Sequence, residues 1–376
     1  MSKPPTRIIS ARLREAREAR GYSIPALAEA LGVSRQAVAQ FEVGQAFPGA
    51  QTISRIYELL NQPPPFFTTP RNRAREVPGT TFWRSLKRMK RHEREKVSRR
   101  LDWLQDIISY LEEFVEFPPV DLPAPIVPPE EIDVGTIEES ANLVRKIWNL
   151  GRGPITDMLG LLESRGFIVV REAVEADDMD AVSRWQCGRP VIFLSADKQI
   201  AARSRFDAAH ELGHLTLHSG VELDAKNITR IEQQANRFAG AFLLPADSFS
   251  REIVSSSVDH LISLKRRWKV SMAAMVYRCK ELGLFSTNQV DYLWRQLSAR
   301  NMRSIEPLDR ELSVEEPRFI AHAAKMILDN GVQSKQDFLD RLLLCPDDIE
   351  GLCGMPKGTL NTTVVPLRIR SRIGAL

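Results

Sequence analysis

Residues 210–214 read His-Glu-Leu-Gly-His, a pattern that combines two metal-binding side chains with one that can move a proton. On a helix, His210 and His214 lie four residues apart and therefore share a face, where both imidazoles can bind the same Zn²⁺. Glu211 lies about 100° around the helix from His210, near enough to take a proton from a metal-bound water. The alternative interpretation is a surface helix with incidental histidines.

A catalytic zinc site needs a third protein ligand, and the best candidate in the sequence is Glu232. On a helix, Glu232 and Asn236 share a face because they are also four residues apart. Glu232 can complete a set of two histidines and one glutamate, which leaves the fourth position for water. Asn236 can accept a hydrogen bond from the far nitrogen of a ligand histidine and so fix its ring. Alternatively, Glu232 is an exposed side chain on a surface helix.

The two segments together resemble the ImmA/IrrE family of metallo-endopeptidases, which is of the gluzincin type. Residues 203–218 read RSRFDAAHELGHLTLH, and residues 232–245 read EQQANRFAGAFLLP. The resemblance implies that His210, His214 and Glu232 bind Zn²⁺ and that Glu211 is the general base. It also implies cleavage of a transcriptional repressor. A further donor to the oxyanion is expected, for which His218, His260 and Tyr277 are the candidates.

A second motif lies near the N-terminus. Ser23 and Ser34 can cap two short helices, at 24–30 and 35–42, on either side of a glycine-containing turn. A capped helix, a tight turn and a second capped helix are typical of a helix-turn-helix. Residues 8–62 resemble the XRE family of phage-repressor-like DNA-binding domains, particularly at residues 34–36 and 41–44.

The second helix of this motif carries the candidate DNA contacts. Arg35, Gln36 and Gln40 suit base edges in the major groove, and Ser34 suits a phosphate. One domain of this type gives limited affinity, so double-stranded DNA is expected to bind a homodimer. The amphipathic face at 101–111 can supply the dimer contact or pack on the peptidase unit. The alternative is a helical interaction module that does not bind DNA.

The pattern of elements predicts a mostly α protein with a small β-sheet, of the α+β class. Strands are expected at 166–170 and 190–194, and most other segments have helical periodicity. Four parts follow, in chain order: a five-helix DNA-binding domain (1–65), a basic helical arm with a proline-rich linker (66–135), a zincin-like metallopeptidase domain (136–300) and a small helical C-terminal domain (301–376).

The basic arm and the tail allow more than one interpretation. From Arg71 to Arg100 there are twelve Arg or Lys residues against three Glu, which fits either a nucleic-acid contact or a solvated helical arm. The tail can serve dimerisation or partner sensing, and it ends in a basic run with Arg368, Arg370 and Arg372.

The bulk composition excludes several classes of protein. With 43% hydrophobic and 27% charged residues, the chain of 376 residues has the composition of ordinary globular proteins. It has no 18-residue apolar run and no N-terminal secretory signal, so we expect a cytoplasmic protein without a membrane partner. Four scattered cysteines are expected to be reduced thiols.

These features predict a DNA-binding transcriptional regulator with zinc-dependent endopeptidase activity toward a repressor-like or antitoxin-like protein. Because both modules lie in one chain, the protein can cleave itself, act on a related repressor, or use the DNA-binding domain as an address. The alternative is a non-catalytic transcription factor or antitoxin in which the metallopeptidase-like domain is a sensor. An intact Glu211 favours chemistry, since a binding-only site needs no base.

Overall fold

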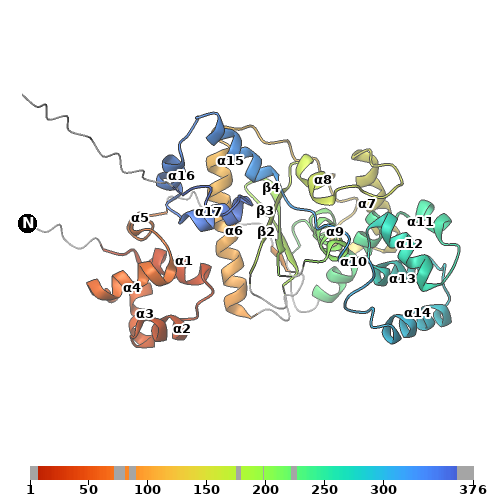
Figure 1. Cartoon of the computed structure of the whole chain (residues 1–376), viewed down its shortest axis with the longest axis horizontal. Coiled ribbons are helices and arrows are strands. Elements are labelled where there is room, and N and C mark those ends of the chain that lie inside the picture. Colours follow the sequence, from red (N-terminus) through yellow and green to blue (C-terminus); the bar gives the residue numbers. More distant parts are fainter. Residues whose placement is uncertain are drawn as a thin grey trace, which may run out of the picture.

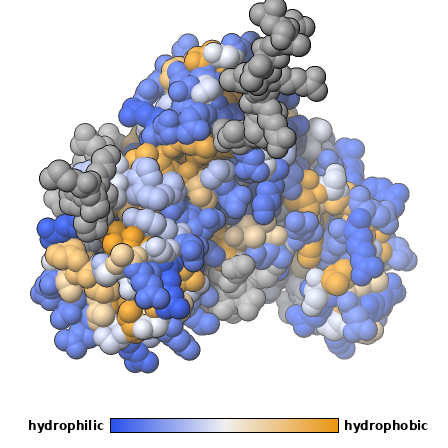
Figure 2. Space-filling view, turned by 60° about the vertical axis from the view of Figure 1, so that its left-hand side comes forward, coloured by the Kyte–Doolittle hydropathy of each residue, from blue (hydrophilic) through white to orange (hydrophobic). Residues whose placement is uncertain are grey.

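The computed structural model describes residues 7–71, 81–83, 90–174, 179–197, 199–221 and 227–361. Within these ranges it contains seventeen α-helices, one short 3-10 helix (η1, Pro129–Glu131) and one four-stranded sheet. The predicted α+β class is therefore confirmed. Hydrophilic residues cover most of the visible face in Figure 2. No helix in the described ranges combines the length and the apolar character needed to cross a membrane.

Five helices build the N-terminal domain, as the sequence predicts. The hydroxyls of Ser23 and Ser34 accept hydrogen bonds from the backbone N–H groups of Ala26 and Ala37 and so cap the second and third helices. Gly32 ends the second helix in the left-handed region, at φ 70°. In chain order the helices are α1 (Ser10–Ala19), α2 (Ile24–Leu31), α3 (Arg35–Val43), α4 (Ala50–Leu60) and α5 (Pro64–Thr68).

The sheet has the strand order β1-β3-β4-β2. Strand β3 is antiparallel to both of its neighbours, whereas β2 runs parallel to β4. Cys187 and Gly188, both at positive φ, form the two-residue turn that joins β3 to β4. The two predicted strands correspond to β2 and β4, while β1 and β3 were not predicted. The strands are β1 (Thr81–Trp83), β2 (Ile168–Glu172), β3 (Ala181–Gln186) and β4 (Arg189–Ser195).

Helices cover both faces of this sheet (Figure 1). Alternate residues of the strands point to opposite faces, so β2 buries Val170 in one core and Val169 in the other. The first core contains the N-terminal domain, α6 (Arg91–Leu111) and the C-terminal helices α15 (Phe319–Asp329), α16 (Lys335–Leu342) and α17 (Pro346–Cys353). The second contains α7 (Val134–Ile147), α8 (Met158–Ser164), α9 (Ala201–Leu217), α10 (Ile228–Leu243), α11 (Ala246–Glu252), α12 (Val258–Trp268), α13 (Met272–Glu281) and α14 (Thr287–Ala299).

Helix α6 is the long helix predicted after the basic arm. Its apolar residues Leu101, Leu104, Ile107 and Leu111 are fully buried in the first core, so this face packs within the chain and is not free for a dimer contact. The C-terminal helices share that core instead of forming one of their own, and the four predicted domain boundaries stay a prediction. The basic run at 368–372 lies outside the described residues.

The proline-rich segment crosses the surface of the second core. Residues 112–128 contain no helix or strand, which agrees with the predicted linker or strap. Asp121 anchors the segment, since its carbonyl accepts a 2.7 Å hydrogen bond from Trp148 Nε1 and its N–H donates to the Arg165 carbonyl at 3.0 Å. Gly166, at φ 80°, lets the backbone of Pro119 approach, because a Cβ there would lie 2.5 Å from its carbonyl oxygen.

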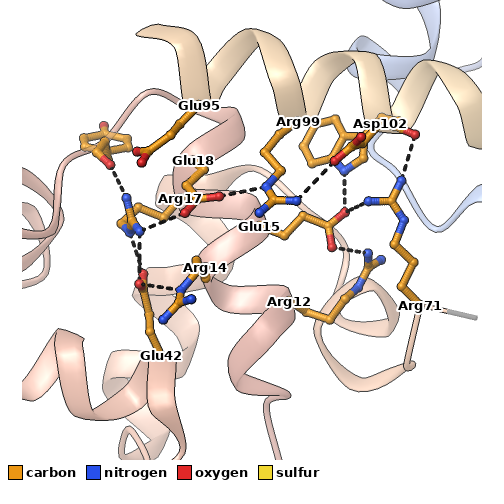
Figure 3. Close-up of polar contacts among 12 residues, drawn as sticks. Arg12, Arg14, Glu15, Arg17, Glu18, Glu42, Arg71, Glu95, Arg99 and Asp102 are labelled. Atoms are coloured by element: carbon orange, nitrogen blue, oxygen red, sulfur yellow. Dashed lines mark hydrogen bonds and ion pairs between the residues drawn. The ribbon is translucent and has the colours of Figure 1, made fainter. Parts of the chain in front are cut away.

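Buried charges join α1 to α6 (Figure 3). Glu15 accepts hydrogen bonds from Trp103 Nε1 at 2.7 Å and from Arg71 at 2.8 Å, and Arg99 donates to Glu18 at 2.7 Å. Arg71 and Arg99 belong to the basic run in which the sequence suggested a nucleic-acid contact or a solvated arm. In the structure both guanidinium groups are used in ion pairs within the chain. Residues 72–80 and 84–89 of the same run lie outside the described part.

Asp348 joins the C-terminal helices to the N-terminal domain and the sheet. Arg20 of α1 donates to both of its carboxylate oxygens, at 2.6 and 2.7 Å. Arg100 of α6 and Gln62 also donate to Asp348, and Arg100 continues to Glu172 at the end of β2 with a 2.8 Å bond. Burial alone would raise the pKa of Asp348, but the charges of Arg100 and Arg20 outweigh it and hold the pKa well below its usual range.

Replacing Asp348 by Asn should therefore lower the free energy of unfolding by about 3–5 kcal/mol at pH 7, because the guanidinium groups of Arg20 and Arg100 lose their shared counter-charge. A carboxylate with a depressed native pKa stabilises fully above its unfolded pKa of about 3.9, and this contribution is lost as the pH falls toward the native value. Urea unfolding of both proteins should thus show a difference that shrinks below about pH 4. The exposed neighbour is the control: Asp347→Asn should leave the midpoint close to the parent, and an equal loss in both variants would contradict the assignment.

Candidate functional site

The predicted metal ligands come together from two packed helices. His210 and His214 lie on α9, and Glu232 lies on the neighbouring α10. Gly213 allows the two helices to approach closely, because a Cβ at this position would lie 3.1 Å from the ring of Phe238 on α10. Both histidines are fully buried, while the side chain of Glu232 is 24% exposed. The local sequence of α9 thus brings Glu232 within reach of both rings.

The spacing of the three ligand atoms fits a small tetrahedral cation. The Nε2 atoms of His210 and His214 are 3.0 Å apart, and the carboxylate oxygens of Glu232 lie 3.5 Å and 3.3 Å from them. A tetrahedral ion with bonds of about 2.0–2.1 Å has ligand atoms about 3.3–3.4 Å apart. Among the described residues, these three side chains form a cluster in which one ligand atom from each lies within 4.8 Å of the others, close enough to hold one metal ion. Two imidazoles and one carboxylate are the donor set that Zn²⁺ takes in catalytic sites.

Asn236 holds the ring of the first histidine. His210 Nδ1 lies 3.0 Å from Asn236 Oδ1, as the sequence predicts for the residue four positions after Glu232. Because the amide oxygen only accepts, Nδ1 carries the proton and Nε2 keeps its lone pair for a metal.

A longer relay holds the second ring, and sequence reasoning did not find it. His214 Nδ1 lies 3.1 Å from His218 Nδ1, and His218 Nε2 lies 3.0 Å from Gln234 Oε1. Gln234 in turn donates to the Ile132 carbonyl at 3.1 Å, so all protons in the relay can run outward from His214. Burial, followed by the neighbouring His214, lowers the pKa of His218 to about 3 and keeps its ring neutral. Both ring nitrogens of His218 are therefore used in contacts with His214 and Gln234.

Glu211 is held by a serine from the sheet. Its carboxylate accepts a 2.5 Å hydrogen bond from Ser183 Oγ, and both side chains are fully buried. Ser183 lies on β3, whose sequence AVSRWQ mixes apolar, polar and charged residues and was not predicted as a strand.

The predicted DNA-reading residues lie on α3, at the outer rim of the N-terminal domain and away from the sheet (Figure 1). Ser34, Arg35 and Gln36 are exposed, whereas Gln40 is half-buried. Glu42, in the segment that carried the family resemblance, is buried instead and accepts bonds from Arg17 at 2.5 and 3.0 Å. The N-terminal half of α3 is thus the part that can enter a groove of DNA.

Known families match the two segments in which these candidate sites lie. Residues 162–280 match the IrrE N-terminal-like domain of a peptidase family, and residues 8–65 match a helix-turn-helix domain. The chain joins a helix-turn-helix domain to an IrrE-like domain. The resemblance seen in the sequence is therefore confirmed for both segments. The two matches give the protein a DNA-binding domain of the transcriptional-regulator type and a domain of the metallopeptidase type.

One curated relative is an archaeal protein. It comes from Pyrococcus furiosus and is named as an HTH-type transcriptional regulatory protein. The two sequences are 44% identical over 57 residues, which is 15% of this chain and 18% of the relative. The chain thus matches less than a fifth of that relative's length, and the likeness concerns a short segment alone.

A cleft of about 990 Å³ opens beside the metal ligands of the IrrE-like domain. Asn236 contributes to its wall, which places the cleft one side chain away from His210. Of the three candidates for the oxyanion donor, Tyr277 lines this cleft and is 60% exposed. His260 is instead bonded to the Glu252 carbonyl at 2.9 Å.

Metal content tests the ligand assignment. We expect about one zinc per chain in Glu211→Gln, because the amide removes the base but no ligand, and a sharp loss in His210→Ala. Inductively coupled plasma mass spectrometry of the purified, dialysed proteins measures both values. Equal occupancy in the two variants would show that the ion is held elsewhere.

The helix-turn-helix domain allows a test of the reading helix. Arg35→Ala should weaken binding to DNA selected by the parent protein from a random library by roughly 1–3 kcal/mol, since a base contact is lost. Arg152→Ala removes the same charge from an exposed turn outside the helix-turn-helix domain and serves as the control. Electrophoretic mobility shifts at one salt concentration give both affinities. Equal affinities would mean that α3 does not read the bases.

Proposed function

We propose that this chain is a DNA-binding transcriptional regulator with a zinc-dependent endopeptidase site that cleaves a repressor-like or antitoxin-like protein. The observation that carries the proposal is that buried His210 and His214 and the partly exposed Glu232 lie at tetrahedral spacing, with Glu211 held by Ser183. A site built only to bind an ion needs no carboxylate of this kind. Double-stranded DNA is the partner of the helix-turn-helix domain, and a homodimer would let two such domains bind neighbouring half-sites.

His210, His214 and Glu232 would hold the ion. When bound, Zn²⁺ supplies a Lewis acid and a water whose pKa is lowered to about 7. Glu211 receives the proton of the attacking water at its carboxylate and later delivers it to the amine of the leaving peptide. Ser183 fixes the carboxylate by donating to Oε2, so that Glu211 does not have to reorient during the transfer. The relays through Asn236 and His218 keep both imidazoles turned toward the ion.

The cleft beside α10 supports the proposal that the substrate is a peptide. Its walls mix apolar and aromatic side chains such as Ile132, Phe206 and Tyr277 with charged ones such as Arg230. Clefts of this size usually bind ligands through apolar walls and a few polar groups that fix orientation. A whole folded regulator is too large for a cleft of this volume. We therefore expect one extended segment of it to bind.

The burial of the site favours a second candidate function. His210, Glu211 and His214 have no exposed surface, so in this conformation a substrate carbonyl does not reach them. A non-catalytic transcription factor or antitoxin could use the same domain as a closed sensor. A regulatory output that is unchanged in zinc-loaded Glu211→Gln would favour the sensor over the peptidase.

Proteolysis provides the direct test. Full-length, zinc-loaded protein is incubated with phage-repressor-type proteins, with and without DNA, and the products are identified by mass spectrometry. We expect one specific cleavage, slowed roughly 10²–10⁴-fold in Glu211→Gln because general-base catalysis is lost. Chelation of the zinc should abolish it. Cleavage that survives in Glu211→Gln would point to a contaminating protease and against the proposal.

A further inference from the structure

Strand β3 links the sheet to the candidate metal centre. It packs on α9, and its residue Ser183 supplies the hydrogen bond to Glu211. On the opposite face of the sheet, buried Arg184 pairs with Asp102 of α6 at 3.1 Å and holds the strand in place. One edge of β3 pairs with six residues of β4. The other edge is therefore the part of the sheet at which a further strand can lie beside the site.

That second edge is already occupied by a short piece of the chain itself. Strand β1 pairs antiparallel with β3 in the register Thr81–Arg184, Phe82–Ser183 and Trp83–Val182. Phe82 is thus opposite the residue that bonds to Glu211. Extended peptides commonly bind proteins by adding a strand to such an edge, through the same backbone N–H and C=O groups that β1 uses here.

We propose that the outer edge of β3 is the docking edge for an extended peptide substrate, and that β1 occupies it as an intramolecular inhibitor. The proposal rests on the proposed peptidase function and deepens it. A peptide that replaces β1 takes its place beside Glu211.

The pairing of β1 is suited to reversible displacement. It involves three residues, whereas six residues join β3 to β4, and short edge strands open at a low free-energy cost. In the sequence, β1 lies between Arg71, which is bonded to Glu15 of α1, and the start of α6. The strand is therefore tied on one side to the helix-turn-helix domain.

A pair of double variants separates backbone pairing from side-chain effects. Thr81→Pro with Phe82→Pro removes the N–H that faces β3, whichever of the two residues donates it. Thr81→Val with Phe82→Val changes the same side chains but keeps both N–H groups and the strand preference, and is the control. All proteins are full-length, zinc-loaded and carry Glu211→Gln, so that a bound peptide is not cut.

The probe is a fluorescent synthetic peptide with the sequence of residues 76–88. We expect the proline variant to bind it with a Kd at least tenfold lower than the parent and the valine variant, measured by fluorescence anisotropy. Hydrogen exchange at residues 182–184 should be at least tenfold faster in the proline variant without peptide and slow again with it. Equal affinities in all three proteins, or unchanged exchange in the proline variant, would overturn the proposal.

Two additions keep the result decisive. If the proline variant fails to fold or to hold zinc, Phe82→Gly weakens the strand more mildly and should show the same changes at a few-fold size. No change in peptide binding or exchange for a folded Phe82→Gly would then overturn the proposal. Cleavage of the peptide by the proline variant with Glu211 intact is measured separately. Binding without cleavage would count against the peptidase function and leave the docking edge in place.

Discussion

The close approach of two buried imidazole nitrogens constrains the rest of the IrrE-like domain. At 3.0 Å and without exposure to solvent, the unprotonated Nε2 atoms of His210 and His214 repel each other unless a cation lies between them and Glu232. Each surrounding feature serves to hold this arrangement. Gly213 lets the helices approach, while Asn236 and the His218 relay fix where the protons lie. The fold thus holds together three groups that form a candidate cation site.

One sheet joins the two modules of the chain. Helix α9, which carries the candidate metal ligands, packs on one face, and α6, the helix-turn-helix domain and the C-terminal helices share the core on the other. Ion pairs continue this connection, from Glu18 through the half-buried Arg99 and Asp102 to Arg184 on β3. The two modules are therefore joined by packed side chains and ion pairs as well as by the chain between them.

Short-range patterns in the sequence predicted much of the site, and long-range contacts account for what was missed. The candidate roles of the two histidines and Glu211 were predicted from their spacing on one helix. Those of Glu232 and Asn236 were predicted from their spacing on a second helix. Strand β3 was missed because Ser183, Arg184 and Gln186 are polar, and polar residues are rarely buried without partners. Their partners lie on other elements: Arg184 pairs with Asp102 of α6, and Ser183 donates to Glu211 of α9. In the same way, the amphipathic face of α6 was predicted, but the sequence of the helix does not indicate which segments pack against it. The role of Asp348 depends on contacts across more than three hundred residues.

The bond between Arg20 and Asp348 also has a consequence for biosynthesis. The two residues are 328 positions apart, so at roughly 5–20 residues per second the ribosome adds Asp348 on the order of 15–65 s after Arg20. For the later part of that interval the DNA-binding domain is complete, but the guanidinium group of Arg20 still lacks its carboxylate partner. A nascent chain can thus scan DNA or meet a second nascent copy before its own last helices lock it against the sheet.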